Sequence, residues 1–551
     1  MNKQIRLRWR SKVLEKLEIL RRFPGYQEVN TFSHPRPDEG FRVNLILRRW
    51  LNNCQRRIQR RLDKCDLRGC SRPMLTASNI HYEVATRTRG ITHGGLGAIH
   101  TLARQLGLID AIDQRLHLLK KHLPYHDSDH VLNIAYNPLC DGTCFQDMEL
   151  RRNDENFLDA LGARRTPDPT TAGDFCRRFK PAHIYTLLDI INDTRLKAWA
   201  GQPQAFFDCA LIDMDGTLVA TTGACKKGMD IAYNGTWGYH PLVLTLANTG
   251  EVLGLVNRPG NRPSHEGAAA EVDRAMAVCF RGGFRKVLLR GDTDFSQTQH
   301  LDRWDDDPRV RFIFGYDAAT NLEDIARALP VRAWRPLERP ARYEVKTQPR
   351  RRRDKVKEAI VVQRGFENLR LRSEEVAEFN YRPTACRKTY RMVVVRKNLT
   401  REKGEVRLFD EVRYFFYITN DWVSEASEVV FAANDRCDQE NLLSQLHSGV
   451  RALKAPTDTL ESNWAYMVMT ALAWNLKAWW ALALPEPGGR WGEKRCEEKA
   501  WVLGLEFKTF VNAFVRLPCQ VLRTGGKLVY RLLSWNPHLP IFLRLVDALR
   551  C

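Results

Sequence analysis

The sequence predicts an α/β protein in which a mixed sheet is flanked by helices. Up to about residue 200, apolar residues recur at intervals of three and four, as in LGAIHTLARQLGLIDAIDQRL, which is typical of amphipathic helices. From about residue 205, runs such as ALIDMDG and RKVLLRG are typical of buried strands. Between about 320 and 400 the chain is strongly basic and strand-like, and a helical pattern resumes after Ser424. We therefore expect a helical N-terminal region and a basic, β-rich insertion in the sheet.

The charge balance suits a polyanionic partner. The 551 residues include 86 Lys and Arg against 65 Asp and Glu, which leaves a net charge of +21. Neutralising phosphates with such a surface releases condensed counterions, whereas the alternative is a basic surface that only aids solubility. The start of the chain lacks the apolar core of a secretory signal. The stretch MVMTALAWNLKAWWALALP is interrupted by Asn475 and Lys477, which favours a buried helix over a membrane span.

Basic residues gather at three places that suit DNA. The first 75 residues or so are Arg-rich, and RRWLNNCQRRIQRRLDKC is either a DNA-binding arm or a solvated helix face. In PDPTTAGDFCRRF a turn and helix caps precede a short basic helix, which exposes Arg177 and Arg178 to a DNA backbone. The insertion contains Trp334, which is either a stacking platform for an unpaired base or a core residue. It also carries four consecutive arginines, Arg350, Arg351, Arg352 and Arg353.

Three carboxylates carry the strongest chemical signal. Asp215 in ALIDMDGTLV and Asp292 in KVLLRGDTDF each stand at the end of a predicted strand, and Glu440 lies in the helical stretch NDRCDQENLLSQL. Magnesium prefers hard oxygen ligands, and three converging carboxylates can hold two ions that act on one phosphodiester. The sequence therefore predicts a metal-dependent enzyme that cuts nucleic acid.

The motif around Asp215 would also suit a phosphatase. DMDGT after an apolar strand is the signature of haloacid-dehalogenase-like phosphatases, built here on Asp213 as nucleophile together with Asp215. Two features disfavour it. Loops and hairpins follow the motif where those enzymes place a helix or cap, and the companion of Asp292 is Asp294, only two residues away. The phosphatase remains the less favoured alternative.

The chain resembles bacterial insertion-sequence transposases of the DDE class. The pieces that carry the resemblance are IDMDGT, YNGTWGYHPLVLTLANTGEVLG, RPGN, LLRGDTDF, YFFYITND and ESNWAYMVMTALAWNLKAWW, from about residue 80 onward. In that family the first aspartate precedes a threonine by two residues, which selects Asp215, and the second follows Arg-x, which selects Asp292. The glutamate belongs to a signature of Tyr, two residues, Arg, three residues, Glu, six residues, Lys.

Arg436 and Glu440 fit that signature, whereas Ala433 and His447 replace its tyrosine and lysine. By resemblance, Arg436 holds a DNA phosphate, and His447 contacts phosphate more weakly and only when protonated. The rival for the glutamate is Glu461, which lacks a basic residue four positions earlier. The two replacements keep open a second possibility, an inactive DNA-binding relative.

The resemblance also implies the fold, cofactor and partners. We expect a ribonuclease H-like core in which Asp215, Asp292 and Glu440 are the catalytic residues and metal ligands for two Mg²⁺ ions, with Mn²⁺ able to substitute. The partners would be double-stranded DNA, namely the terminal inverted repeats of the element and the target, with the protein dimeric on DNA. No membrane association is expected, and the place of action would be the bacterial cytoplasm, at the nucleoid.

The predicted parts follow from these features. They are a basic Arg-rich arm (1–80), a helical DNA-binding region (81–203), the first part of the catalytic core (204–320), the basic β-rich insertion (321–405), the second part of the core with the glutamate helix (406–485) and a helical region for dimerisation (486–551).

Overall fold

The computed structural model forms two compact units, residues 1–83 and 84–551, which are described separately. It describes residues 39–63, 80–81, 88–120, 124–223, 225–339, 360, 364, 367–403, 406–486 and 492–549. In the first unit, α2 (Glu39–Asp63) is a 25-residue helix with Arg60 and Arg61 in its last turn. All further elements belong to the second unit.

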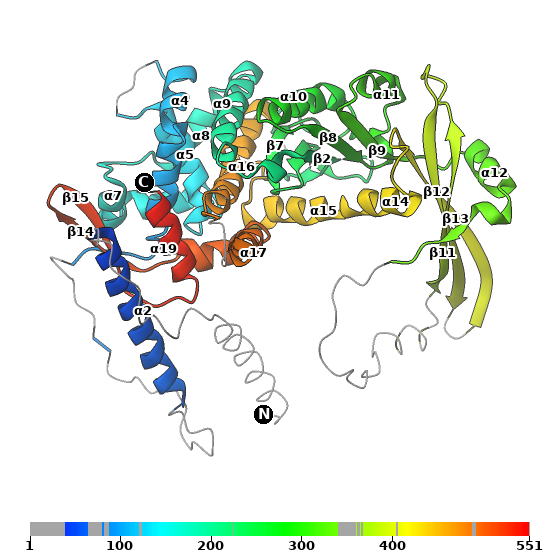
Figure 1. Cartoon of the computed structure of the whole chain (residues 1–551). Coiled ribbons are helices and arrows are strands. Elements are labelled where there is room, and N and C mark those ends of the chain that lie inside the picture. Colours follow the sequence, from blue (N-terminus) through cyan, green and yellow to red (C-terminus); the bar gives the residue numbers. More distant parts are fainter. Residues whose placement is uncertain are drawn as a thin grey trace. The chain divides into compact units, whose positions relative to one another are not determined.

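A mixed sheet forms the centre of the second unit (Figure 1). Its five core strands have the order β7-β6-β2-β8-β9. The strands are β2 (Cys209–Gly216), β6 (Leu242–Leu246), β7 (Glu251–Val256), β8 (Lys286–Gly291) and β9 (Val310–Tyr316). β2 pairs antiparallel with β6 and β6 with β7, whereas β2, β8 and β9 run parallel. This order and these directions are those of a ribonuclease H-like core, so the predicted fold class is confirmed.

Turns in the core follow the sequence signals. Gly250 connects β6 and β7 with φ 71°, a left-handed conformation that glycine adopts without a Cβ clash. The amide of Asn248 bridges this turn to β2, since it accepts from Leu211 N at 2.8 Å and donates to Cys209 O at 2.9 Å. The hairpin expected at Asn248-Thr249-Gly250 is therefore confirmed.

The insertion extends the same sheet. β10 (Arg335–Pro336), β11 (Glu367–Tyr381), β12 (Tyr390–Lys403) and β13 (Val406–Thr419) add to it in the order β10-β11-β12-β13-β9. β13 pairs antiparallel with β9 at Phe416↔Tyr316 through Thr419↔Ile313. Because β12 and β13 form one hairpin, the boundary expected at residue 405 falls inside it. The insertion is β-rich as predicted, but it is continuous with the core sheet.

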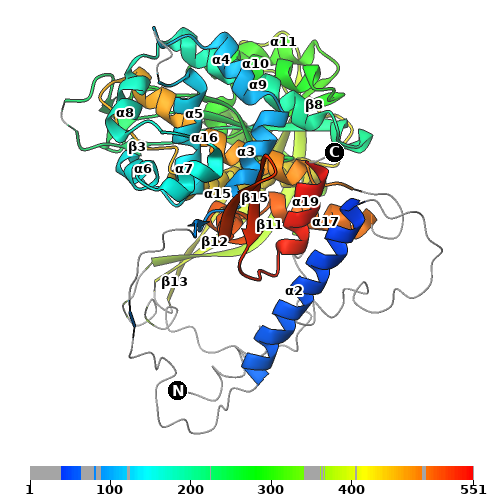
Figure 2. The same cartoon turned by 90° about the vertical axis from the view of Figure 1, so that its left-hand side faces the viewer.

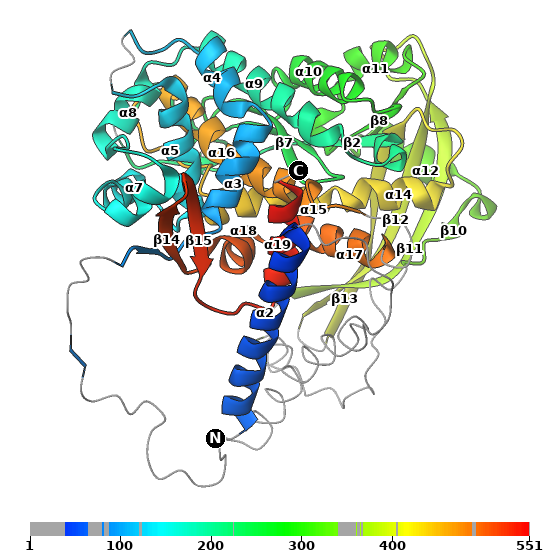
Figure 3. The same cartoon turned by 60° about the vertical axis from the view of Figure 1, so that its left-hand side comes forward.

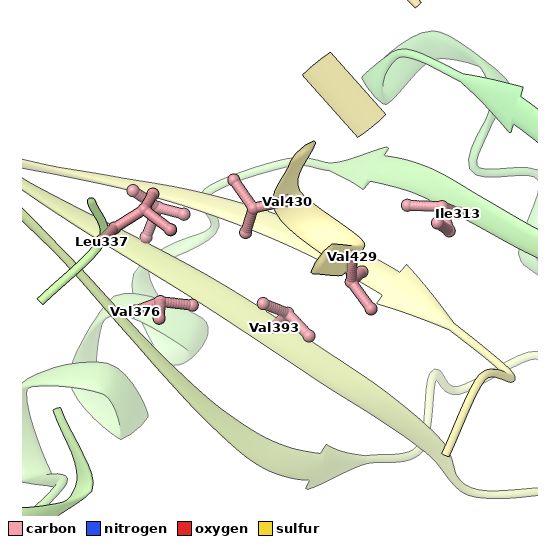
Figure 4. Close-up of a cluster of buried hydrophobic side chains, with 7 residues drawn as sticks. Ile313, Leu337, Val376, Val393, Val429 and Val430 are labelled. Carbon is pink, nitrogen blue, oxygen red and sulfur yellow. The ribbon is translucent and has the colours of Figure 1, made fainter. Parts of the chain in front are cut away.

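Helices cover both faces of the core sheet (Figure 1). α10 (Ala268–Arg281) lies on one face, against β2, β6, β7 and β8, and α14 (Ala426–Asp435) packs on the other, against β9, β11 and β12. Val429 and Val430 of α14 are buried against Ile313, Val376 and Val393 (Figure 4). The remaining helices near the sheet are α11 (Thr298–Asp305), α12 (Thr320–Ala328) and α15 (Cys437–Ser444), the last followed by a π-helical turn, η5 (Gln445–Gly449).

A helical region surrounds α16 (Leu460–Leu482), which α3, α5, α8 and α9 contact (Figure 2). Its members are α3 (Leu96–Gln105), α4 (Leu108–Arg115), α5 (Asp127–Leu139), α6 (Met148–Arg152), α7 (Glu155–Leu161), α8 (Pro169–Arg177) and α9 (Pro181–Trp199). At the start of α8, Asp168 caps the helix by accepting from Thr171 N at 2.9 Å, as the sequence predicts. From Ser462 to Leu482 every residue of α16 is buried, so this apolar stretch is a core helix.

A buried carboxylate joins α16 to the sheet and to α9. Glu251 on β7 accepts from Arg195 Nε at 2.9 Å and Trp479 Nε1 at 2.7 Å, with Trp199 and Thr249 as further donors. Four donors satisfy a charge that would otherwise be costly to bury. The sheet is therefore joined to the helical region by a hydrogen-bonded network as well as by apolar packing.

The last 60 residues differ from the expected helical region. They contain α17 (Gly492–Leu503), α18 (Phe507–Phe510), η6 (Val511–Val515) and α19 (Leu539–Ala548), but also a hairpin of β14 (Cys519–Thr524) and β15 (Lys527–Leu532) (Figure 3). β14 pairs with β1 (Gly90–Ile91), which ties this segment to the start of the unit. Among the ranges that the structure describes, no helix is long and apolar enough to cross a membrane.

Candidate active site

Two of the predicted carboxylates meet at one edge of the sheet. Asp215 is the penultimate residue of β2, and Asp292 follows the last residue of β8. Because these strands are parallel neighbours, their ends lie at the same edge. The guanidinium of Arg436 links the two side chains, with Nη1 3.3 Å from Asp215 Oδ2 and Nη2 3.9 Å from Asp292 Oδ2. The fold therefore brings the two predicted aspartates together with Arg436.

Burial makes both carboxyl groups weaker acids than usual. The pKa of Asp215 is raised to about 6, mainly by desolvation, which Arg436 opposes and the nearby Asp292 reinforces. Desolvation also raises the pKa of Asp292, again opposed by Arg436 and reinforced by Asp294. The two carboxylates thus repel each other in a partly dry site, where a cation is favoured. Arg436 supplies positive charge there.

A second charged pair lies directly behind these aspartates. Asp213 and Arg290 each precede a site aspartate by two residues and are partners in the β2–β8 register. Arg290 donates to both carboxylate oxygens of Asp213, at 2.6 and 2.8 Å, and through Nη1 to the carbonyl of Ala432 in α14 at 2.9 Å. Both side chains are nearly fully buried. One guanidinium therefore ties together β2, β8 and α14.

This pair removes the phosphatase alternative. Its nucleophile would be Asp213, but that carboxylate is buried and held bidentately by Arg290. Sequence reasoning used Arg290 only to select Asp292 and missed its ion pair with Asp213. The sequence did contain a signal for this pair. Asp213 and Arg290 each stand two residues before a site aspartate, and residues two apart on a strand lie on the same face of the sheet.

Glu440 lies on the helix that delivers Arg436, but its side chain points to solvent. It stands four residues after Arg436 in the first turn of α15 and is exposed. The neighbouring Gln439 donates to the carbonyl of Val243 at 3.3 Å, and Val243 is the β6 partner of Asp215. The backbone of α15 is thus fixed beside the two aspartates. Within the described part of the chain, no three His, Cys, Asp or Glu side chains are grouped closely enough to hold a metal ion.

The donor set nevertheless fits hard divalent cations. Asp215 and Asp292 present carboxylate oxygens to a shared point that already accommodates a positive group. The third carboxylate is on a side chain with rotatable bonds, on a helix anchored at Gln439. The rival Glu461 lies instead in the first turn of α16, where it acts electrostatically on Tyr239.

The imidazole of His447 contacts Thr217, which directly follows β2. It lies in the π-helical turn η5, and its Nε2 is 2.9 Å from Oγ1 of Thr217, two residues after Asp215. Desolvation lowers the pKa of His447, so its imidazole is neutral at neutral pH. The expected phosphate contact would require protonation of this imidazole and stays a prediction. In the structure the residue holds Thr217.

The other predicted DNA-binding residues have different surroundings. Arg177 is exposed and pairs with Asp174 at 2.8 Å and Asp458 at 2.7 Å, and Arg178 is exposed beside it. Trp334 is 7% exposed, with the guanidinium of Arg396 4.2 Å from its ring centroid. A buried ring cannot stack on a base, so Trp334 is a core residue and the platform expectation is wrong. The four arginines at 350–353 lie outside the described residues.

Comparisons with known proteins find a matching family. Residues 80–492 match a family model described as "Transposase DDE domain group 1". No curated protein matches the sequence. Among solved structures, the chain is similar to a piggyBac transposase in a synaptic complex with hairpin DNA, with 10% identity and a TM-score of 0.35; the match covers 78% of this chain and 84% of that one.

Proposed function

The chain belongs to the transposases with a DDE domain, and from this premise we propose that Asp215, Asp292 and Glu440 are its catalytic triad. The observation that carries the proposal is the convergence of Asp215 and Asp292 on Arg436, one helical turn before Glu440. We propose that the protein binds the terminal inverted repeats of its element, cleaves the DNA there and joins the 3′-hydroxyl ends to target DNA.

The residues divide this work between them. Asp215 and Asp292 supply fixed oxygen ligands, and Glu440 completes the set from the exposed face of α15. Two Mg²⁺ ions, when bound, would activate the attacking water or 3′-hydroxyl and stabilise the leaving oxygen. Arg436 offers a planar guanidinium that suits bidentate contact with a DNA phosphate. His447 and the Asp213–Arg290 pair keep the strands and the helix in register beside the substrate.

A second candidate function is DNA binding without cleavage. It is favoured by the outward position of Glu440 and by the replacement of the family's tyrosine and lysine with Ala433 and His447. The basic net charge serves both candidates equally. Only a measurement of DNA cleavage distinguishes the two candidate functions.

The test is strand cleavage of a labelled duplex that carries the DNA flanking this coding sequence, with Mg²⁺, Mn²⁺ or EDTA. Metal-dependent cutting at a repeat boundary is the expected result. The variants Asp215→Asn, Asp292→Asn and Glu440→Gln should abolish cutting and leave binding of the ends largely intact. Binding without cutting by the unmodified protein, with either metal and with both ends supplied, would establish the second candidate.

Two substitutions in the same chain serve as matched controls. Asp294→Asn changes an exposed aspartate two residues after Asp292, and Glu461→Gln changes the rival glutamate. Both should retain cleavage. If Glu461→Gln abolished cutting and Glu440→Gln did not, the glutamate assignment would be wrong while the enzyme class would stand.

A further inference from the structure

A small three-stranded sheet follows β2, the strand that bears Asp215. The strands are β3 (Val219–Ala220), β4 (Asp230–Ile231) and β5 (Trp237–Tyr239), with β5 between the other two. Thr217, next to the end of β2, donates its backbone N–H to the carbonyl of Pro241 at 3.1 Å. Both ends of this segment thus return to the candidate active site. We call residues 230–239 the aromatic hairpin.

Its outer face carries large side chains that no other described residue covers. Ile231 and Trp237 are direct cross-strand partners, so their side chains share one face, and they are 45% and 53% exposed. Tyr233, in the connecting turn, is 93% exposed. Exposed Trp, Tyr and Ile next to one another on one hairpin form an apolar patch of the kind that marks binding surfaces.

The base of the hairpin is firmly held. Tyr239 is buried, and its hydroxyl donates to the carbonyl of Lys227 at 2.9 Å. Gly260 donates to Gly238 O at 3.0 Å, and a Cβ at Gly260 would stand 2.4 Å from the carbonyl oxygen of Asp230, so only glycine permits this approach. Lys226 Nζ donates to the carbonyl of Thr457 at 2.8 Å. The exposed rings therefore stand on an ordered support.

Exposed basic residues are linked to the same support. Lys227 is exposed, and its backbone N–H donates to the carbonyl of Asp458 at 2.7 Å. The carboxylate of Asp458 is the partner of Arg177, and Arg178 is exposed next to it. Aromatic rings beside Lys and Arg on one surface are the combination that binds single-stranded nucleic acid, since the bases stack and the phosphates pair.

We propose that the aromatic hairpin is a stacking platform for unpaired bases of the DNA near the cut, with Trp237 and Tyr233 as the stacking residues. This rests on the proposed function. Thr221 donates its N–H to Trp237 O at 3.0 Å, and only six peptide units join Thr221 to Asp215. At most about 20 Å therefore separates their Cα atoms, a length of about six stacked bases. The platform lies within reach of a frayed or opened end held at Asp215.

A second copy of the chain is the competing occupant. Interface cores are depleted in Lys, whereas the segment that carries this patch has the exposed Lys227 and is linked through Asp458 to the exposed Arg177. These cations match a polyanion better than a copy of a protein whose net charge is +21. We therefore assign the patch to DNA.

The test uses two short duplexes of the same sequence, one blunt and one with a few unpaired bases that include 2-aminopurine at one end. Affinity and 2-aminopurine quenching are measured with Ca²⁺ in place of Mg²⁺, for the unmodified protein and for Trp237→Ala, Trp237→Phe and Tyr233→Ala. The matched control is Trp422→Ala, because Trp422 is also 53% exposed but lies after β13. Sedimentation of each variant reports its oligomeric state.

Trp237→Ala should weaken binding of the frayed duplex by about 5- to 100-fold, with loss of quenching, and leave the blunt duplex nearly unchanged. Trp237→Phe should retain most of the affinity for the frayed duplex and most of the quenching, and Trp422→Ala should retain both in full. Equal effects of Trp237→Ala and Trp422→Ala, or a change of oligomeric state without a change in quenching, would overturn the platform. If the variants confirm the platform but the protein never cuts DNA, the proposed catalysis is refuted and the platform stands.

Discussion

The buried pair of Asp213 and Arg290 offers the most direct test of how the site is held together. We predict that Arg290→Met and Asp213→Val each lower the free energy of unfolding by about 3–5 kcal/mol, because each leaves one buried charge without its partner. Arg290→Met also leaves the Ala432 carbonyl without this donor. The double variant replaces both charges with apolar groups and should cost far less than the sum of the two, by several kcal/mol.

The assay is urea unfolding of the four proteins in a double-mutant cycle. Burial already raises the pKa of Asp213 despite the pair, and loss of Arg290 should raise it further. A carboxyl whose pKa is raised on folding destabilises the protein only above its unfolded pKa, so the defect of Arg290→Met should shrink as the pH falls toward about 4. Cleavage should be lost in both single variants, since a displacement of about 1 Å at the site costs about 100-fold in rate.

A matched pair lies at the opposite end of the same two strands. Asp208 and Arg285 form an ion pair at 2.8 Å, but both side chains are 60% exposed. Arg285→Met should therefore change the free energy of unfolding by only about 0–1 kcal/mol. A similar cost for Arg285→Met and Arg290→Met, or additive effects of Asp213→Val and Arg290→Met, would refute the claim that the buried pair fastens the site.

Three further predictions concern buried charges. Asp215→Asn should stabilise the metal-free protein by up to about 3 kcal/mol at pH 7, because the pKa of Asp215 is raised to about 6; urea unfolding should show this gain vanish as the pH falls below about 4. Lys477 is 2% exposed, and burial lowers its pKa to about 7. Lys477→Met should therefore raise the midpoint of thermal unfolding at pH 7, and this gain should shrink toward pH 10. A lower midpoint at pH 7 would contradict this. Glu251→Gln should cost about 3–5 kcal/mol by leaving Arg195 buried without an anion, and unchanged stability in denaturant would refute the role of that network.

Much of the fold followed from periodicity, because the core strands and the long helices have unambiguous patterns. The strands around Asp215 and Asp292, the turn at Gly250 and the helix at Pro169 all formed where the sequence indicated. The hairpin of β14 and β15 was missed because its strands are short and Val529 and Leu528 are partly exposed, which leaves a weak alternation.

The site was predictable to the extent that it is local. Asp215 and Asp292 stand at strand ends, a signal that a single sequence contains. The surroundings of Trp334, the contact that His447 makes and the role of Arg290 depend on partners far away in the chain, namely Arg396, Thr217 and Asp213. No local pattern specifies those contacts, so only the fold could decide them.

The contact between Arg436 and Asp215 has a consequence for synthesis, because it closes over 221 residues and spans the whole insertion. At about 5–20 residues per second, the ribosome needs about 10–40 seconds to pass from the aspartate to the arginine. β2 is already made when that interval begins and β8 is made during it, whereas Arg436 and the helix with the glutamate come only at its end. On the proposed function, a growing chain would therefore be unable to cut DNA before Arg436 and Glu440 are made, and the order of the sequence itself would delay the chemistry until the protein is nearly finished.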